Sequence, residues 1–559
     1  MEITAAKALA QALVCMGTEW VYGIVGTSNI AFLDALYEIR DKIRYISCRH
    51  EQVAASMADA QGRLTGKPGV ALVHSGPGAL NAAISVGNAY KDCSPMILIT
   101  GAVKRKLAGS DGMLEINHLK IFEPLCKGVY RIEKASGILE IFQTAYIESL
   151  ISPRGPVLIE VPEDVWLEKA KLNPDKLSLE VPLTEPINKN EVQNVLNILK
   201  DSNLPLILSG GGVAYSGASG KLVEFAEKLK VPVITTGNGR GTIPERHPLC
   251  LGRVGFGGGT PVADSAFQKA DALLCIGCYL SDMTTYEFTL RTEAKEIIAV
   301  NTSERIAPQA QSPTKFIKGD AYEFLDTSLG ILKAENASKE YEWDKVLEKE
   351  KSDWEKMKEL CLKRESDLPS AGKVANVLGQ RLASDAIICV GAGTHLLYPM
   401  AYIPSEKPLC FLSTVNFGSM GFGFAASMAA KLIHPERQVI TIIGDGDFMM
   451  TVQDLETAVR ERIPVKVFVF NDFRYRVLTL RQMLQFEGRI YGTVHGNPDF
   501  ASIACSFGAR GYKLDDQAKI EETIENALAE KEPVVVDVLI DPNDLPPMNI
   551  EANLRMSAG

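Results

Sequence analysis

The sequence predicts an α/β protein built from three doubly wound domains, each with a parallel sheet. Its main support is the repeated order of a short apolar strand, a glycine-rich turn and an amphipathic helix. The 559 residues exceed what one hydrophobic core usually serves, and 46% hydrophobic with 23% charged residues is typical of a folded globular protein. We therefore expect domains over residues 1–170, 188–333 and 369–545.

A polar, proline-containing connector from about residue 171 to 188 separates the first two domains. In the first domain, apolar runs at 70–73 and 96–99 predict buried strands that are followed by helices. The second domain opens with a predicted helix around 192–199 and a strand at 206–208. Both domains thus begin with the strand and helix alternation of a parallel sheet.

A charged segment from residue 335 to 364 precedes the third domain. Its Glu, Lys, Asp and Trp residues alternate at helical spacing, which predicts a solvated connecting helix. In the third domain we expect strands at 387–390, 439–443 and 465–470. A helix is predicted to begin near Met450.

The acidic balance of the chain argues against nucleic-acid binding. The formal net charge is -10 and no block of Lys and Arg occurs, whereas phosphate binding relies on such clusters. No apolar run approaches the roughly 18 residues that a membrane span needs, and the start lacks a basic stretch leading into an apolar one. We therefore expect a cytoplasmic protein that acts on a small molecule, with neither nucleic acid nor membrane as a partner.

The chain has 11 cysteines, most of them single residues within apolar runs, as Cys48, Cys389 and Cys410 are. This pattern predicts reduced cysteines in the core. Cys275 and Cys278 have the spacing of a zinc or redox pair, but no second pair or nearby histidine completes such a site. We therefore favour a buried strand for this pair as well.

A glycine run at 210–212, after a predicted strand, raises an alternative class of protein. Such a turn can bind a dinucleotide, but the third spaced glycine of that motif is absent, because Tyr215 stands there. A tight turn without a ligand explains the run equally well. A nicotinamide-dependent oxidoreductase is therefore the weaker hypothesis, and a purified protein without nicotinamide would remove it.

Two oxygen-rich strand ends in the third domain point to a metal site. The strand predicted at 439–443 runs into a Gly-Asp-Gly-Asp turn that contains Asp445, and 27 residues later the next strand ends in Asn471 and Asp472. This is about the length of one strand-helix-strand unit, so the two aspartates should lie side by side. Mg²⁺ prefers such oxygen ligands together with phosphate oxygens. An isolated Gly-Asp-Gly sequence is more often a simple turn. The second oxygen-rich strand end, at Asn471 and Asp472, makes a metal site the favoured interpretation.

These residues resemble the thiamine diphosphate signature of the acetolactate synthase-like family, which also includes benzoylformate decarboxylases and 2-hydroxyacyl-CoA lyases. The resemblance covers nearly the whole chain. Further segments that match the family's motifs, in family order, are 48–58, 74–81, 239–242 with 247–249, and 418–423. The resemblance implies a pyrimidine-binding domain first, a central domain second and a diphosphate-binding domain last. It also implies thiamine diphosphate and Mg²⁺ held between two subunits, in a homodimer at minimum and a homotetramer as the expected assembly.

By the same resemblance, Glu51, His74 and Met420 are the catalytic residues. Glu51 matches the glutamate that hydrogen-bonds the cofactor's pyrimidine ring, and Met420 matches the apolar residue that holds the cofactor bent. The other implied cofactor contacts are Pro77, Asn81, Gly393, Thr394, His395, Ser419, Gly444, Gly446 and Asp447. Glu51 and Met420 also have a plainer structural explanation, a helix N-terminal charge for Glu51 and core filling for Met420.

The metal ligands that the resemblance implies are the side chains of Asp445 and Asp472 and the backbone carbonyl of Arg474. The family usually has asparagine where this chain has Asp472. A carboxylate is still an oxygen ligand, but it adds negative charge beside a diphosphate. We therefore expect metal binding to persist, with an altered metal preference.

Other departures from the family concern the central domain. Acetolactate synthases carry an arginine where this chain has Tyr279, so a contact to a flavin is missing. We therefore expect no FAD. The central domain is then either empty or open to an adenine nucleotide, such as the CoA handle of a thioester.

The residues expected near the substrate also depart from acetolactate synthases. Those enzymes place an aromatic residue and a glutamine before the glutamate that aligns with Glu115, where this chain has Met and Leu, and they carry a tryptophan near the position of Arg481 or Gln482. His74 instead matches a proton-transferring histidine of benzoylformate decarboxylase-like enzymes, and Thr27 could add a hydroxyl contact. His74 as a strand-end residue that points away from the cofactor remains the alternative.

These observations predict a thiamine diphosphate- and Mg²⁺-dependent enzyme that breaks or makes a carbon-carbon bond next to a carbonyl group, as a decarboxylase, lyase or carboligase. We expect little acetolactate synthesis. The alternatives are a true acetolactate synthase catalytic subunit, an enzyme of the 2-hydroxyacyl-CoA lyase or oxalyl-CoA decarboxylase type, and a non-catalytic regulatory homologue. The presence of Glu51, Met420 and Asp445 together argues against the last.

Overall fold

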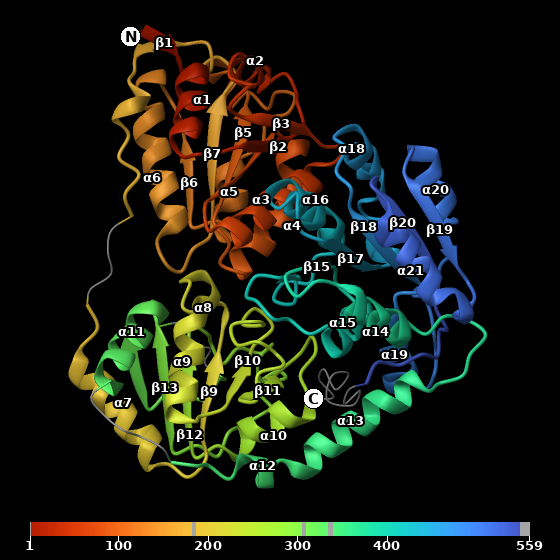
Figure 1. Ribbon diagram of the computed structural model, residues 1–559. Coiled ribbons are helices and arrows are strands. Elements are labelled where there is room, and N and C mark those ends of the chain that lie inside the picture. Colours follow the sequence, from red (N-terminus) through yellow and green to blue (C-terminus); the bar gives the residue numbers. More distant parts are fainter. Residues whose placement is uncertain (1, 182–185, 305–308, 334–338, 548–559) are drawn as a thin grey trace.

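The computed structural model of the protein describes residues 2–181, 186–304, 309–333 and 339–547. Figure 1 shows three domains, and each contains a six-stranded parallel sheet flanked by helices. The predicted α/β fold class with three parallel-sheet domains is therefore confirmed. The domain boundaries at residues 170, 188, 333, 369 and 545 remain predictions.

The first domain has the strand order β3-β2-β4-β5-β7-β6. Its strands are β2 (Trp20–Gly23), β3 (Arg44–Ser47), β4 (Gly69–Val73), β5 (Met96–Ala102), β6 (Gly128–Arg131) and β7 (Pro156–Pro162). Its helices are α1 (Ala5–Cys15), α2 (Ile30–Glu38), α3 (Glu51–Thr65), α4 (Pro77–Lys91), α5 (His118–Phe122) and α6 (Ile138–Leu150). A small antiparallel pair, β1 (Glu2–Thr4) with β8 (Lys169–Lys171), joins the start of the domain to its end. The strands predicted at 70–73 and 96–99 are β4 and β5.

The central domain has the strand order β11-β10-β9-β12-β13-β14. Its strands are β9 (Pro205–Ser209), β10 (Val233–Thr235), β11 (Cys250–Arg253), β12 (Ala272–Ile276), β13 (Glu296–Asn301) and β14 (Lys315–Lys318). Its helices are α7 (Lys189–Asp201), α8 (Gly211–Tyr215), α9 (Ser219–Leu229), α10 (Pro261–Lys269) and α11 (Ala321–Leu332). The direction of the strand order reverses between β9 and β12, which is where open α/β sheets commonly bind ligands.

The third domain has the strand order β16-β15-β17-β18-β20-β19. Its strands are β15 (Ile387–Val390), β16 (Phe411–Leu412), β17 (Val439–Gly444), β18 (Lys466–Asn471), β19 (Arg510–Leu514) and β20 (Val534–Leu539). Its helices are α14 (Ala371–Arg381), α15 (Leu397–Tyr402), α16 (Phe422–Ile433), α17 (Asp445–Phe448), α18 (Leu455–Arg460), α19 (Arg476–Gln485), α20 (Phe500–Phe507) and α21 (Ile520–Ala529). The neighbouring strands β15, β17 and β18 bring their carboxyl ends to one edge of the sheet.

The first and third domains pack against each other through α3 and α16, which lie side by side in Figure 1. Buried residues of both domains form one hydrophobic cluster, which includes Ala58 of α3 and Ala426 of α16. The many alanines on these two helices allow close contact between their backbones. This contact brings the start of α3 to the loop that precedes α16.

Two local predictions need correction or completion. The helix predicted near Met450 begins earlier, because α17 starts at Asp445, and a second helix, α18, follows it. The charged segment forms α12 (Trp343–Val346) and α13 (Glu348–Leu362), and α13 buries none of its residues, as expected of a solvated helix. Residues 335–338 of that segment and 182–185 of the first connector lie outside the described residues.

The cysteines singled out in the sequence are free and buried: Cys48, Cys275, Cys278, Cys389 and Cys410. Over the described ranges, no three His, Cys, Asp or Glu side chains form a group that could hold a metal. Cys275 lies in β12 as expected, whereas Cys278 is buried in the loop that follows this strand. In the same ranges, no helix is long and apolar enough to cross a bilayer.

Candidate active site

Glu51 is the first residue of α3 and lies at the end of β3, where His50 caps the helix by accepting a hydrogen bond from the Gln52 amide. Its side chain is buried, with 8% of the residue exposed. The Asn81 side-chain amide donates a 2.9 Å hydrogen bond to Glu51 Oε2. A Cβ atom at position 78 would lie 3.1 Å from Glu51 Oε1, so Gly78 leaves room beside the carboxylate. The structure therefore brings Glu51 and Asn81 together.

The turn before α4 is supported by His118 and Glu160, two residues outside the motifs described above. Gly76 has a φ of 67°, which favours glycine, and its amide donates a 3.0 Å hydrogen bond to His118 Nε2. His118 Nδ1 in turn contacts the buried Glu160 carboxylate. This support fixes the start of α4, where Pro77 is exposed. His118 belongs to none of the motifs described above, so its role could not be predicted from them.

His74 follows β4, and its Nδ1 lies 2.7 Å from Ser28 Oγ. A side chain at Gly26 would collide with the imidazole ring, so glycine is required there. Burial lowers the pKa of His74 below its ordinary value, and the nearby Glu51 opposes this effect, so the ring is neutral at pH 7. Thr27 is exposed; the hydroxyl that contacts His74 belongs to Ser28.

A cavity of about 130 Å³ lies at the edge of the third sheet where β15, β17 and β18 end. Its lining includes these predicted cofactor and metal residues: Gly393, Thr394, His395, Met420, Gly444, Asp445, Gly446, Asp447, Asp472 and Arg474. Ser419, which is 6% exposed, precedes Met420 in the same loop. The structure thus gathers the predicted residues of the third domain around one space.

Asp445 is fixed by hydrogen bonds to both carboxylate oxygens. Oδ1 accepts from the Gly446 amide at 2.6 Å, and Oδ2 accepts from the Phe473 amide and the Asn497 side chain, both at 2.7 Å. His495 Nε2 lies 3.7 Å from Oδ2. The contact to Phe473 places Asp445 beside Asp472, as the parallel strands predicted.

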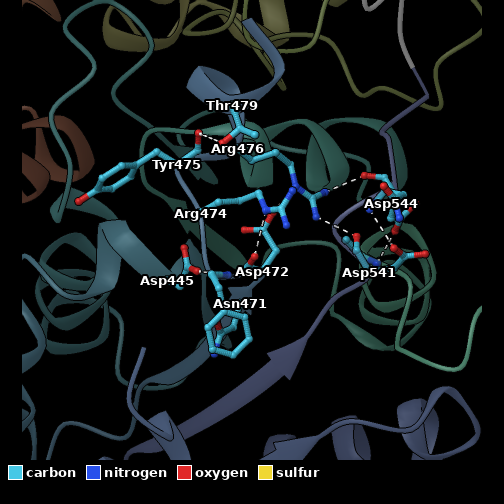
Figure 2. A network of polar contacts seen from close by, with 12 residues as sticks. Asp445, Asn471, Asp472, Arg474, Tyr475, Arg476, Thr479, Asp541 and Asp544 are labelled. Atoms are coloured by element: carbon cyan, nitrogen blue, oxygen red, sulfur yellow. Dashed lines mark hydrogen bonds and ion pairs between the residues drawn. The ribbon is translucent and has the colours of Figure 1, made fainter. Parts of the chain in front are cut away.

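Asp472 is paired with Arg476, a buried arginine that belongs to none of the motifs described above. Arg476 Nε donates a 2.6 Å hydrogen bond to Asp472 Oδ2, and Figure 2 shows this contact beside Asp445. Burial raises the pKa of Asp472 above its ordinary value and the Asp445 charge adds to this rise, whereas Arg476 opposes it. Asp472 precedes α19, which begins at Arg476, and Phe473 between them has a positive φ of 61°, so no helical spacing predicts this pair.

Asp447 links three parts of the cavity. Its Oδ1 accepts a hydrogen bond from the Gly421 amide, and its Oδ2 lies 3.3 Å from His395 Nε2. A Cβ atom at position 391 would overlap Asp447 Oδ2 at 1.7 Å, so Gly391 is required for this arrangement. Asp447 therefore fixes the loop after Met420 as well as lining the cavity.

The loop that carries Met420 also touches the first domain. Gln52, next to Glu51, donates a 2.6 Å hydrogen bond from Nε2 to the Met420 carbonyl. Glu51 itself does not line the cavity of the third domain. Within one described chain, the predicted site thus consists of two parts: a first part around Glu51 and Asn81, and a second part around Asp445.

The residues of the second part fit a diphosphate bound through Mg²⁺. Thr394 Oγ1 is buried and has no hydrogen-bond partner in the described part of the chain, so a ligand oxygen would satisfy it. Side chains at Gly444 and Gly446 would collide with the rings of His395 and Tyr475, so glycines keep the backbone accessible. The carboxylates of Asp445 and Asp472 supply the oxygen ligands that Mg²⁺ prefers.

Arg481 and Gln482 of α19 are the two residues near the position where acetolactate synthases carry a tryptophan, and their contacts differ. Gln482 bonds to the Tyr491 backbone through both amide atoms, at 2.8 and 3.0 Å. Arg481 Nε and Nη2 are buried without a hydrogen-bond partner among the described residues. Arg481 lies one turn after Val477, which lines the cavity. Of the two, only Arg481 therefore keeps unpaired polar atoms near the site.

The fold and the two parts of the site define a class, which the comparisons confirm. Three descriptions match in chain order: thiamine pyrophosphate enzyme, N-terminal TPP binding domain, over residues 3–121; the central domain over 192–327; and the C-terminal TPP binding domain over 391–538. The chain is therefore a thiamine diphosphate-dependent enzyme.

Similar proteins narrow this class to a family. A probable acetolactate synthase large subunit of Methanocaldococcus jannaschii is 33% identical, over 97% of this chain and 93% of its own length. The acetolactate synthase large subunit of Corynebacterium glutamicum is 31% identical over 96% and 87% of the two chains, and that of Haemophilus influenzae 30% over 97% and 95%. The chain belongs to the acetolactate synthase family of thiamine diphosphate enzymes.

Proposed function

We propose that the protein uses thiamine diphosphate and Mg²⁺ to join 2-oxo acids, with acetolactate formation from pyruvate as the first reaction to test. When bound, thiamine diphosphate supplies the carbon nucleophile and the electron sink for the acyl group. The carboxylate of Glu51, held by Asn81, is placed to hydrogen-bond a ring nitrogen and to move a proton there. Asp445, Asp472 and the Arg474 carbonyl would hold the metal.

One observation carries this proposal. The chain has both a buried Glu51 that accepts a hydrogen bond from the Asn81 amide and a cavity lined by carboxylates, and its relatives are named acetolactate synthases. The relatives favour the acetolactate synthase alternative over the decarboxylase or lyase expected from the sequence. The decarboxylase or lyase expectation depends on the departures before Glu115 and at Arg481 or Gln482, and on His74.

Incubation of the purified enzyme with pyruvate, thiamine diphosphate and Mg²⁺, followed by product analysis, tests the reaction. We expect acetolactate together with one carbon dioxide per product. If acetaldehyde forms without acetolactate, the enzyme decarboxylates pyruvate and does not carry out carboligation.

We also propose that a second copy of the chain completes the site. On α4, Leu80 and Ile84 are 46% and 40% exposed and lie on the same face as Pro77 and Asn81. An exposed apolar stripe that includes a site residue is typical of a surface covered by a partner. A homodimer would place one chain's Glu51 part against the other chain's cavity, and two such dimers would form the expected homotetramer.

The geometry of His74 favours a second candidate function, decarboxylation or lyase chemistry. Its ring has a pKa lowered by burial, is oriented by Ser28 and lies near Glu51, so it can take up a proton and pass it to an acyl fragment. In this case His74, rather than a second 2-oxo acid, determines the product.

We expect His74→Ala to distinguish the two candidates. If His74 transfers protons, benzoylformate decarboxylation and 2-hydroxyacyl-CoA cleavage should fall by about 10²–10⁴-fold, whereas carboligation of pyruvate should change little. Steady-state kinetics on the three substrates measures this, with His434→Ala as a histidine control away from the site. Equal activity of variant and wild type on every substrate would leave His74 a structural residue.

The central domain has a cavity of about 380 Å³ at the carboxyl ends of β9, β12, β13 and β14. Gly211 lies at the first of these ends, Asn301 at the third and Asp320 just after the fourth, and Tyr279 also lines the space. Both the size and the position at the reversal of strand order suit a small ligand. We propose an adenine nucleotide, such as that of CoA, as the occupant.

We expect the purified protein to contain no FAD, because Tyr279 stands where a flavin contact is expected. The absorbance spectrum of the freshly purified enzyme measures this, and thermal shift with ADP or CoA tests the nucleotide. A yellow protein that releases flavin on denaturation would contradict the expectation.

A further inference from the structure

Arg476 is a buried arginine at the first position of α19, four residues after Asp472. The side chains of Arg476 and Asp472 are 5% and 4% exposed. Removing an arginine from water is unfavourable unless its charge is paired and its N–H groups find acceptors. Figure 2 shows how this need is met: the guanidinium lies between Asp472 and the segment that contains Asp541 and Asp544.

The guanidinium donates to one charged and three neutral acceptors. Its charged partner is Asp472, at 2.6 Å. The neutral acceptors are the Tyr398 hydroxyl at 2.9 Å, the Asp544 carbonyl at 2.7 Å and the Asp541 carbonyl at 2.9 Å. In the ranges that the structure describes, Asp472 is the only carboxylate paired with Arg476, so the two charges neutralise each other.

This pairing leaves Asp472 with one oxygen for a ligand. Oδ2 accepts from Arg476, whereas Oδ1 accepts no hydrogen bond from a described residue, and Asp472 lines the cavity. A free carboxylate can bind a hard cation through both oxygens. When Arg476 occupies Oδ2, Asp472 presents only Oδ1 to a cation. The charges of Asp472 and Arg476 sum to zero, so the pair acts as a neutral amide ligand would.

We propose that Arg476 is a positioning residue for the divalent cation: it turns one oxygen of Asp472 toward the cavity and offsets the charge that this carboxylate adds beside a diphosphate. The proposal rests on the proposed function, because it requires a Mg²⁺-diphosphate complex in this cavity. It predicts that Arg476 and Asp472 act as a unit, so that removing both is less harmful than removing Arg476.

The test is a double-mutant cycle with Arg476→Met, Asp472→Asn and the double variant. Calorimetry measures Mg²⁺ affinity of the metal-free protein in the presence of thiamine diphosphate. Arg476→Met should lower the affinity by about 10–100-fold, the usual effect of losing a group that orients a metal ligand. Asp472→Asn should also lower it, because the arginine is then left buried without its counter-ion.

The double variant should bind Mg²⁺ within about tenfold of wild type, since it restores both neutrality and a single oxygen ligand. Arg489→Met is the matched control, because it removes an arginine from an exposed pair with Glu487, with side chains 67% and 83% exposed. We expect wild-type affinity from this control. Thermal unfolding without metal, recorded for each variant, separates a loss of folding from a loss of binding.

Unchanged Mg²⁺ affinity in Arg476→Met, or losses that simply add in the double variant, would overturn the proposal while leaving the proposed function intact. If Arg476→Met does not fold, the double variant decides: near wild-type affinity supports the pairing, and weak binding overturns it. A wild type that binds neither Mg²⁺ nor thiamine diphosphate would overturn the proposed function and this proposal with it.

Discussion

Replacing Glu51 with glutamine is expected to lower turnover by at least about 100-fold, the usual effect of losing an acid-base group, while folding and cofactor binding stay nearly intact. The amide of glutamine fills the same space at the start of α3 and can still bond to Asn81, but it cannot take up the proton. The measurement is kcat together with the rate of hydrogen exchange at the thiazolium carbon of bound cofactor.

Glu140→Gln is the matched control, because Glu140 is also an acidic residue in the first turn of a helix but is exposed. It should retain wild-type turnover. Wild-type exchange at the thiazolium carbon in Glu51→Gln would show that Glu51 serves only as a helix N-terminal charge.

Asp445→Ala is expected to abolish metal-dependent retention of thiamine diphosphate. Without Asp445 the cation loses one ligand, and the diphosphate then faces Asp447 and Asp472 without the charge that bridges them. The variant also loses the hydrogen bonds that hold the Phe473 amide and the Asn497 side chain. Calorimetry with thiamine diphosphate and Mg²⁺ measures the loss.

Asp515→Ala provides the control for Asp445→Ala, since Asp515 is a half-exposed aspartate of the same domain whose carboxylate lies 3.8 Å from Lys513 Nζ. It should bind both ligands as wild type does. Unchanged cofactor affinity in Asp445→Ala would place the metal elsewhere.

The strand ends that carry the site were predictable because backbone geometry determines them. Parallel neighbours separated by one strand-helix-strand unit must end at the same edge of a sheet, and Asp445 and Asp472 lie side by side for that reason. The helix predicted near Met450 instead begins at Asp445, as α17. Acidic residues in the first turn of a helix are favourable, and Asp445 and Asp447 occupy that turn.

The residues that support the site were not predictable in the same way. Asn497 and His495 reach Asp445 from a segment beyond α19, and only the folded path of that segment brings them there. His118 supports the turn before α4 through a contact 42 residues away in the chain. Such contacts depend on tertiary packing, which local patterns do not encode.

The central claim is that each thiamine diphosphate site combines Glu51 of one chain with Asp445 of another. Mixing the Glu51→Gln and Asp445→Ala variants tests this claim most directly. Each variant alone should be inactive. In a mixed dimer, one site combines both defects and the other combines two native parts. After subunit exchange of equal amounts, we expect acetolactate formation from pyruvate to return to about a quarter of the wild-type rate, because half of the dimers are mixed and each has one intact site of two. Mixed dimers that form but show no activity would contradict the shared site.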